Sequence, residues 1–240
     1  MPTRFVRTFR ERLTDALNTE DVASGIALGK CVGVYAFYDY DDEPIYVGQT
    51  TEDFATRVGR HLRGQRSDTL AYRILDPFEV ATMRLWPRQD TRAMPAAERR
   101  ATIDALEYSV YLHAIEESKY GAILNEKIPP QSPRVDPLPR SYGFELIDPE
   151  LREEREHPDV RIARRAETLA RVAAVAHERG EVSAGLRRVI VIQAVRLADL
   201  AAARLAYAEG RPGARPDAID VHALVGNVRA DSDQDAGSED

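Results

Sequence analysis

The spacing of apolar residues along the first half of the chain predicts a mixture of helices and strands. Residues 3–18 carry an apolar residue every three or four positions, which is the period of an amphipathic helix. Next, two runs rich in Val, Ile, Tyr and Phe flank a short acidic turn, which predicts a β-hairpin. The expected ranges are 32–39 and 44–48 for the hairpin, 51–62 for a second helix, 78–86 for a third strand and 96–118 for a long helix.

The helix that follows the hairpin has expected ends as well as an expected range. Thr51 is expected to cap its start, with Glu52 and Asp53 in the first turn, where negative charge complements the helix dipole. Gly64 is expected to end it just after residue 62 or 63.

The second half of the chain begins with a run of prolines. Residues 126–140 contain five prolines, which exclude a regular helix and predict an extended arm or a boundary. Residues 150–209 are rich in Ala, Leu, Val and Arg, and predict a hairpin of two helices, 159–179 and 183–209. The acidic end of the chain is expected to be disordered.

These elements together predict an α/β protein of the α+β type. We expect a small, mainly antiparallel three-stranded sheet flanked by helices, with a C-terminal helical extension. The expected segments are an N-terminal helical arm (1–27), the sheet-containing domain (28–128), a proline-rich connector (129–149), the helical hairpin extension (150–210) and an acidic tail (211–240). The apolar faces of the long helices favour packing over DNA reading by their arginines Arg164, Arg165, Arg187, Arg188 and Arg196.

Composition excludes several classes of protein. The single cysteine excludes an intrachain disulfide framework and a zinc site built from cysteines. No apolar run reaches the length of about 18 residues that spans a bilayer, and no secretory leader is recognisable, so we expect a cytoplasmic protein without membrane contact. The net charge of −7 argues against a general nucleic-acid coat, but the last ten residues alone hold five acids and no base.

Two tyrosines lie beside glycines in the predicted hairpin, and a basic helix follows. Tyr35 ends the segment Gly33-Val34-Tyr35, and Tyr46 begins the segment Tyr46-Val47-Gly48. Tyrosine is also an ordinary strand residue, so structural packing is an alternative interpretation. Residues 57–66 then hold four arginines, one histidine and no acid, which is typical either of a solvated basic face or of a surface that binds phosphate.

Glu107 is the strongest single candidate from position alone. The apolar stripe of the 96–118 helix is formed by Ile103, Leu106, Val110 and Ala114, and Glu107 falls within that stripe. A carboxylate aimed at a core is costly unless it is paired, protonated or bound to a metal. It is therefore either a structural ion-pair partner of a basic residue such as Arg57, or a metal ligand or catalytic carboxylate.

Taken in order, these residues resemble the motifs of the GIY-YIG nuclease superfamily. The two tyrosines stand 11 residues apart, as is typical of that family. The Arg of the next helix, its partner four residues later, the Glu of a later helix and a following Asn are matched by Arg57, His61, Glu107 and Asn125. The chain departs from the family where Gln49 replaces a frequent Lys after the second motif.

The resemblance implies hydrolysis of a DNA phosphodiester with one divalent cation, Mg²⁺ or Mn²⁺, bound by Glu107. It implies catalytic roles for Tyr35, Tyr46, Arg57, His61, Glu107 and Asn125, and substrate contacts for Gly48, Gln49, Arg60 and Arg63. Tyr35 is the expected general base, Tyr46 would position the water or the phosphate, and His61 would orient Tyr35 or relay its proton.

Three uses of such a protein follow from the resemblance. The first is a standalone restriction or genome-defence endonuclease, with DNA as partner and a possible homodimer through the C-terminal helices. The second is a structure-specific nuclease of repair or recombination. The third is a DNA-binding or partner-binding module that has lost its activity, because a fold does not determine a function.

Overall fold

An open antiparallel sheet lies at the centre of the computed structural model, which describes residues 3–62, 74–180, 182–213, 215 and 218–230. The strand order is β2-β1-β3-β4, with every neighbouring pair antiparallel. The strands are β1 (Gly33–Tyr38), β2 (Pro44–Thr50), β3 (Thr82–Pro87) and β4 (Tyr142–Glu145). All six residues of β1 are buried, because this central strand is covered on both faces.

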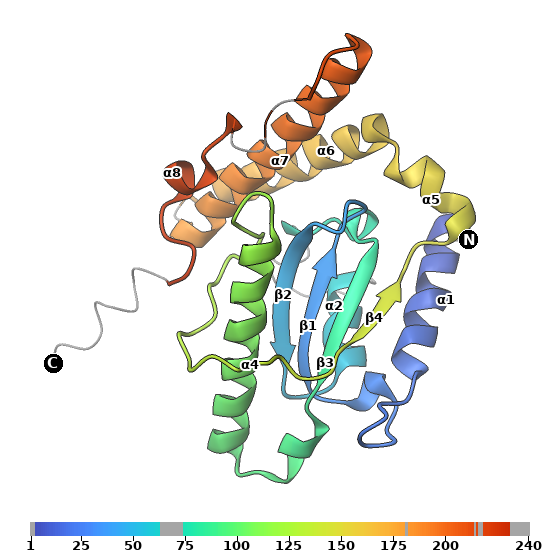
Figure 1. The fold of residues 1–240 in the computed structure, drawn as a ribbon, viewed down its shortest axis with the longest axis vertical. Helices are drawn as coiled ribbons and strands as arrows, with labels where there is room; N and C mark the ends of the chain where they lie inside the picture. Colours follow the sequence, from blue (N-terminus) through green and yellow to red (C-terminus); the bar gives the residue numbers. More distant parts are fainter. Residues whose placement is uncertain (1–2, 63–73, 181, 214, 216–217, 231–240) are drawn as a thin grey trace, which may run out of the picture.

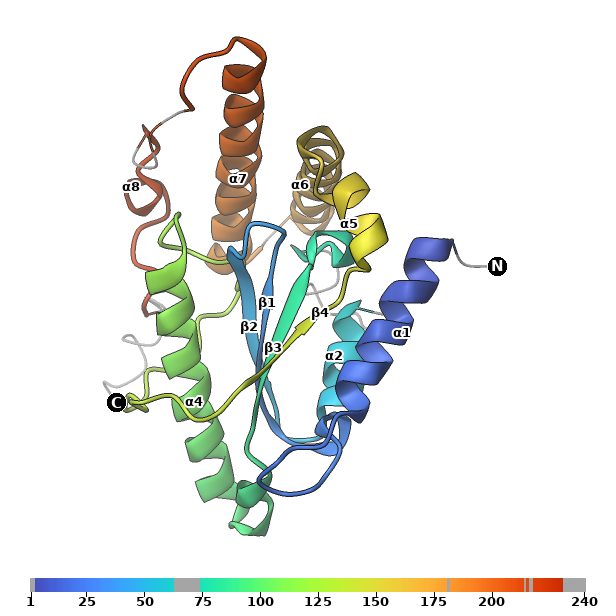
Figure 2. The same ribbon diagram turned by 45° about the vertical axis from the view of Figure 1, so that its right-hand side comes forward.

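Helices cover the two faces of the sheet, as Figures 1 and 2 show. Helix α4 (Ala96–Glu117) packs on β2 and β1 from one side. Helices α1 (Arg4–Asn18) and α2 (Phe54–Leu62) lie on the other side. Strand β2 is the edge strand nearest to α4, so residues from both helical layers meet beside it.

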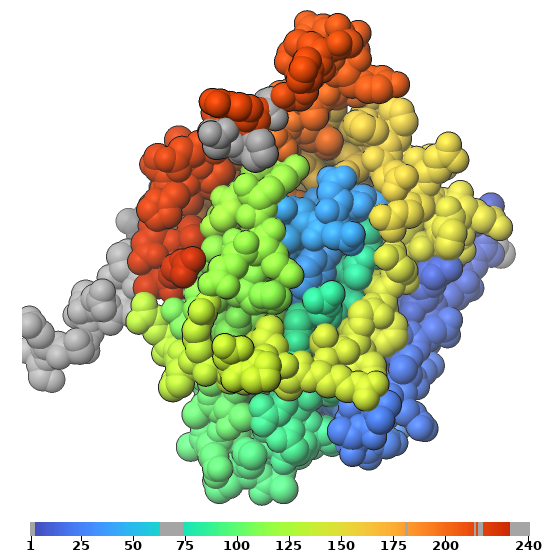
Figure 3. All heavy atoms as spheres, in the orientation of Figure 1, coloured from blue at the N-terminus to red at the C-terminus, as the bar shows by residue number. Residues whose placement is uncertain are grey.

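The C-terminal extension lies at the hairpin-turn end of the sheet (Figure 1). It contains α5 (Pro149–Glu156), α6 (Pro158–Arg179), α7 (Ala184–Ala208) and the short α8 (Val221–Val225). Helices α6 and α7 pack against each other as the predicted hairpin. In the space-filling view, the end of the β-hairpin is visible in blue between α4 in green and the yellow segment that follows β4 (Figure 3).

Buried ion pairs join this extension to the sheet. Asp39, at the end of β1, contacts Arg161, Arg165 and Arg196 at 3.1, 2.9 and 2.7 Å, and all four side chains are almost fully buried. Arg165 also contacts Glu79 at 3.0 Å. These arginines are therefore engaged in packing, as expected for the two helices, and are not available to DNA.

The sheet has four strands, so the prediction of three was wrong. The fourth strand, β4, lies within the range 129–149 predicted as a connector, and its residues pair with β3 from Thr82↔Glu145 to Leu85↔Tyr142. It has only four residues and follows a proline-rich segment, so its local sequence carries little strand signal; pairing with β3 determines its conformation.

Several boundaries also differ from the prediction. Helix α2 begins at Phe54, and Asp53 caps it in place of Thr51, because its side chain accepts a hydrogen bond of 2.6 Å from the backbone N–H of Thr56. Strand β3 begins at Thr82 instead of residue 78, since Pro77–Glu79 form a short 3₁₀ helix. Helices α5 and α8 were not predicted. Gly64 and the acidic end 231–240 lie outside the described residues.

None of the described helices combines the length and the apolar character that crossing a membrane requires.

Candidate active site

The register of the β-hairpin places both tyrosines on one face of the sheet. Tyr35 of β1 lies opposite Gly48, and Tyr46 of β2 lies opposite Phe37. Because residues two apart on a strand share a face, both aromatic rings point toward α2. Their centroids are 6.2 Å apart, and the ring of His61, from α2, lies 5.7 Å from Tyr35 and 5.2 Å from Tyr46.

Gly48 provides the space in which the two rings meet. A Cβ atom at this position would lie 2.5 Å from the hydroxyl oxygen of Tyr35 and 3.0 Å from Cε1 of Tyr46. Any side chain would therefore displace the tyrosine hydroxyl. The substrate contact that the resemblance implies for Gly48 stays a prediction; the role visible in the structure is to leave room for the hydroxyl of Tyr35.

Tyr35 and His61 form a buried hydrogen-bonded pair. The Tyr35 hydroxyl oxygen lies 2.8 Å from Nε2 of His61. Burial, reinforced by the positive charges of Arg57 and Arg60, lowers the pKa of His61 to about 4. The ring is therefore neutral near pH 7. In the tautomer that carries its hydrogen on Nδ1, Nε2 accepts a hydrogen bond from the Tyr35 hydroxyl.

Both phenols keep their protons in this arrangement. Burial, together with the neighbouring Tyr46, raises the pKa of Tyr35 well above its ordinary value, although Arg57 opposes the change. Burial likewise raises the pKa of Tyr46 to about 12. An ionised tyrosine is thus absent near neutral pH, so any proton that Tyr35 accepts must be passed on.

Arg57 lies one turn before His61 on α2 and faces the same site. Its charge acts on both tyrosines and on Glu107, whose ionised forms it favours. Its Nε atom is buried and has no hydrogen-bond partner among the described residues. A buried donor without a partner is costly, and an anion held beside Arg57 would satisfy it.

Glu107 reaches the site from α4, between buried apolar neighbours such as Leu106 and Val110. Burial raises the pKa of Glu107 to about 7, and the negative charge of Asp104 adds to the effect, while Gln49 and Arg57 oppose it. No ion pair joins Glu107 to Arg57 in the part of the chain that the structure describes. The structural ion pair considered from the sequence is therefore not formed.

Asp104 is a second carboxylate beside Glu107 that sequence reasoning missed. It lies three residues earlier on α4, and its Oδ1 accepts a hydrogen bond from Nε2 of Gln49. The spacing of three residues on a helix, Asp104 to Glu107, was the available signal. The side chain of Gln49 therefore connects β2 to a carboxylate of α4.

These residues fit a divalent cation of the Mg²⁺ type. Across the described ranges, no group of three or more His, Cys, Asp and Glu side chains is arranged to enclose a metal. Mg²⁺, however, usually keeps several waters and binds through one or two carboxylates plus substrate phosphate. Burial and the neighbouring Asp104 raise the pKa of Glu107 by disfavouring its negative charge, and a cation bound there would favour that charge.

Asn125 belongs to the scaffold of the site. Its side-chain amide donates to the carbonyl of Val47 at 2.8 Å and accepts from the N–H of Val47 at 3.0 Å. It thereby satisfies the free edge of β2 in the way a neighbouring strand would. Asn125 therefore holds β2 in position, and the catalytic role that the resemblance implies for it stays a prediction.

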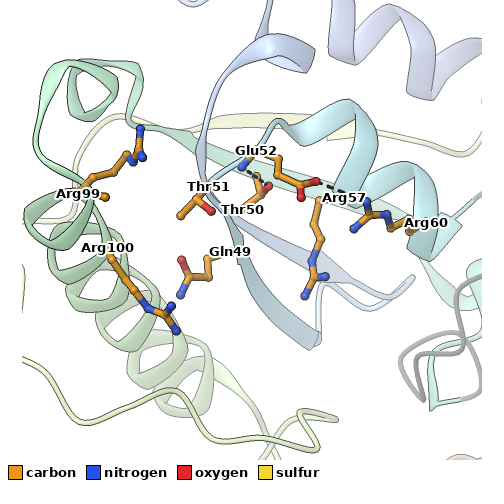
Figure 4. Close-up of a pocket in the computed structure, with 9 residues that line it drawn as sticks. Gln49, Thr50, Thr51, Glu52, Arg57, Arg60, Arg99 and Arg100 are labelled. Carbon is orange, nitrogen blue, oxygen red and sulfur yellow. Dashed lines mark hydrogen bonds and ion pairs between the residues drawn. The ribbon is translucent and has the colours of Figure 1, made fainter.

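A groove of about 470 Å³ opens beside these residues, between α2 and α4 (Figure 4). Its floor is the end of β2 and the following turn, from Gln49 to Glu52. Arg57 and Arg60 of α2 line one wall, and Arg99 and Arg100 of α4 line the other. Arg60 contacts Glu52 at 3.4 Å, and Arg63 lies outside the described residues.

Residues 31–108 match the family model of the GIY-YIG catalytic domain. The match contains both tyrosines, Arg57, His61 and Glu107, whereas Asn125 lies beyond it. No curated protein matches the chain, and no solved structure does. The matched segment is less than half of the chain; over it the chain is similar to the GIY-YIG nuclease superfamily, and this similarity suggests a nuclease.

Proposed function

We propose that the protein is a divalent-metal-dependent DNA endonuclease that hydrolyses phosphodiester bonds in restriction or a related form of genome defence. One observation carries the proposal: Arg57, with a buried and unpartnered Nε, lies beside both the Tyr35–His61 pair and Glu107. A cation, a proton-transfer pair and a carboxylate close to one another are the groups that phosphodiester hydrolysis requires, and Arg57 also lines the groove.

Arg57 is the proposed phosphate ligand. Attack at phosphorus builds negative charge on the non-bridging oxygens, and the guanidinium offers several N–H donors in a fixed planar geometry. Because Arg57 is half-buried, its attraction for phosphate is screened less than that of an exposed arginine. Gln49 and Arg60 line the groove beside this position, as proposed substrate contacts.

Tyr35 and His61 are the proposed route for the proton of the attacking water. The Tyr35 oxygen accepts that proton while its own hydroxyl proton passes to Nε2 of His61, so Tyr35 need not be ionised at any point. His61 then becomes positively charged. A bound phosphate favours this protonated form, because its negative charge lies nearby. Tyr46 is proposed to orient the water or the phosphate.

Glu107 is the proposed ligand of the Mg²⁺ or Mn²⁺ ion, and Asp104 adds negative charge next to it. When bound, the cation stabilises the charge that develops on the phosphate and on the leaving oxygen. Gln49 holds Asp104 in place through its side-chain amide. Asn125 keeps β2, and therefore Tyr46 and Gln49, in position.

The defence role is supported by how the extension is attached. Buried ion pairs fix α6 and α7 to the hairpin end of the sheet, so they present a rigid surface beside the catalytic domain. The proposed site of one chain, formed by the described residues, cuts one strand at a time, so cutting both strands needs two copies or two successive nicks. We propose a homodimer through the C-terminal helices, because Leu205 and Tyr207 of α7 are exposed.

A plasmid assay with purified full-length chain tests this proposal. Supercoiled DNA incubated with Mg²⁺ is expected to become nicked and then linear, and EDTA is expected to stop the reaction. Discrete fragments support a site-specific defence enzyme, whereas cutting restricted to branched or flapped DNA would instead indicate a structure-specific repair nuclease. Binding without any cutting would indicate a module that has lost its activity.

A further inference from the structure

Helix α4 forms one wall of the groove. Two arginines on this wall take no part in the hydrolysis proposed above. Arg99 and Arg100 lie at the start of α4, across the groove from Arg57 and Arg60 (Figure 4). The groove is lined by four arginines and one acid, Glu52. A chain with a net charge of −7 thus concentrates positive charge on both sides of one groove.

These two arginines are weakly neutralised by the protein itself. Arg99 is half-buried and forms no ion pair with any described residue. Arg100 lies 3.8 Å from Asp104, but its side chain is 80% exposed, and such exposed pairs contribute little. By contrast, Arg161, Arg165 and Arg196 of the extension are all held by buried carboxylates. The cations of α4 therefore remain open to an anionic ligand.

The position of Arg100 relative to Glu107 suggests what that ligand is. The two residues are seven positions apart on α4, so they share a face and lie about 10 Å apart along the helix axis. The phosphates of one DNA strand advance by about 3.4 Å per nucleotide along the duplex axis. A strand whose phosphate is held between Arg57 and Glu107 thus brings other phosphates of the same strand level with Arg100.

The start of α4 adds to this positive field. Its N-cap residue is Pro95, which makes no side-chain hydrogen bond to the first turn, and Ala96 lines the groove. The free N–H groups of a long helix attract anions.

We propose that Arg99 and Arg100 bind backbone phosphates of the cleaved DNA strand, a few nucleotides from the phosphate that is cut. The strand passes between α2 and α4, with Arg57 holding the reacting phosphate and the α4 arginines fixing its neighbours. Arg99 and Arg100 are therefore binding and positioning residues that act on the strand as a whole. This inference rests on the proposed function, because it takes DNA as the ligand of the groove.

The test compares two double variants of equal charge change, Arg99→Gln/Arg100→Gln and Arg7→Gln/Arg10→Gln. Arg7 and Arg10 lie on the exposed face of α1, on the other side of the sheet. The affinity of each full-length protein for a labelled DNA duplex is measured in EDTA, so that no cleavage occurs, at several NaCl concentrations. Melting temperatures show that both variants are folded.

The α4 variant is expected to bind about tenfold more weakly at low salt, and its plot of log affinity against log salt should be shallower by about 1.8, since each lost phosphate contact removes about 0.9. The α1 variant should match the wild type. With Mg²⁺, the α4 variant should change KM more than kcat, because it loses contacts away from the reacting phosphate.

Salt dependence that is the same in the α4 variant and the wild type would overturn the inference. The outcome for hydrolysis is separate. If the wild type cuts plasmid but the α4 variant keeps its salt slope, the proposed function stands and this inference is wrong. If the wild type binds but never cuts, and the α4 variant loses the slope, the phosphate contacts stand and hydrolysis is wrong.

Discussion

Gly48 determines whether the two tyrosines can lie together, although it carries no chemistry of its own. The hydroxyl of Tyr35 occupies the space that a side chain on residue 48 would fill, and this placement allows the bond of 2.8 Å to His61. The second glycine motif is thus a packing requirement for the first tyrosine. Glycine is needed here because the Tyr35 side chain of the neighbouring strand β1 leaves no room for a Cβ atom.

The variant Gly48→Ala tests this directly. Its Cβ would lie 2.5 Å from the Tyr35 hydroxyl, so the ring must move, the bond to His61 is lost, and overpacking costs about 1–3 kcal/mol of stability. We expect DNA cleavage to fall by about a hundredfold or more. The control is Gly143→Ala in β4, where a Cβ meets nothing within 4 Å. Equal cleavage by the two variants would contradict the packing role.

His61 provides a test through pH. Its folded-state pKa is about 4, whereas the ordinary value is 6.5, so the unfolded chain takes up this proton first as pH falls. The stability that neutral His61 contributes is complete above pH 6.5 and is lost as pH falls toward 4, by at most about 3 kcal/mol.

We therefore expect the melting temperature of wild type to fall more steeply between pH 7 and pH 4.5 than that of His61→Gln. The matched control is His113→Gln, because His113 is a partly exposed histidine on α4 that lies beside Glu117. This control should follow the wild type. If the melting temperatures of the wild type and His61→Gln change in parallel with pH, burial of neutral His61 does not make stability depend on pH.

At the scale of elements, the sequence predicted what local patterns determine. The periodicity of α1, the strand-forming residues of the hairpin and the helix-forming composition of the two long helices of the extension are local signals, and these elements form close to where they were expected, as does α4. Strand β4 was missed because it exists only through its pairing with β3. The start of α2 was misplaced because three neighbouring residues are all suitable caps, and only the backbone path selects Asp53.

In the site, as in the fold, the sequence predicted the residues that local patterns mark and missed those that only tertiary packing brings together. Glu107 interrupts an apolar stripe, so its sequence position alone marked it as costly. Asp104 and the arginines Arg99 and Arg100 sit on the polar part of α4, where charged residues are ordinary. They become notable only once β2 and α2 are placed opposite them, which no local pattern reveals.

At the scale of the whole molecule, buried charge unites the two parts of the chain. Burial opposes ionisation of Asp39, but Arg196, Arg165 and Arg161 outweigh it, so the pKa of the carboxyl is lowered. The hairpin of the sheet and both long helices of the extension thus meet at one carboxylate. Removing one partner of such a group leaves buried charge without compensation.

Asp39→Asn is accordingly expected to lower the free energy of unfolding by about 3–5 kcal/mol in urea titrations. The control is Asp41→Asn, which also removes a carboxylate that contacts Arg161, at 2.8 Å, but one that is 53% exposed. Its cost should stay below about 1 kcal/mol. A similar small loss in both variants would mean that the cluster does not hold the extension in place.

Charge is also distributed unevenly at this scale. The chain is acidic overall, yet the groove beside the tyrosines is lined by four arginines and a single acid. The local field, and not the net charge, determines whether a polyanion binds at that position.

The most direct test of the account is cleavage of supercoiled plasmid by the wild type and by Glu107→Gln, each with Mg²⁺ and with EDTA. Glutamine keeps the size of the side chain and removes only the negative charge that would hold the cation. We expect nicking by the wild type with Mg²⁺ and a loss of about a hundredfold or more in the variant, with DNA binding retained. Cleavage by Glu107→Gln at the wild-type rate, or by the wild type in EDTA, would contradict the account.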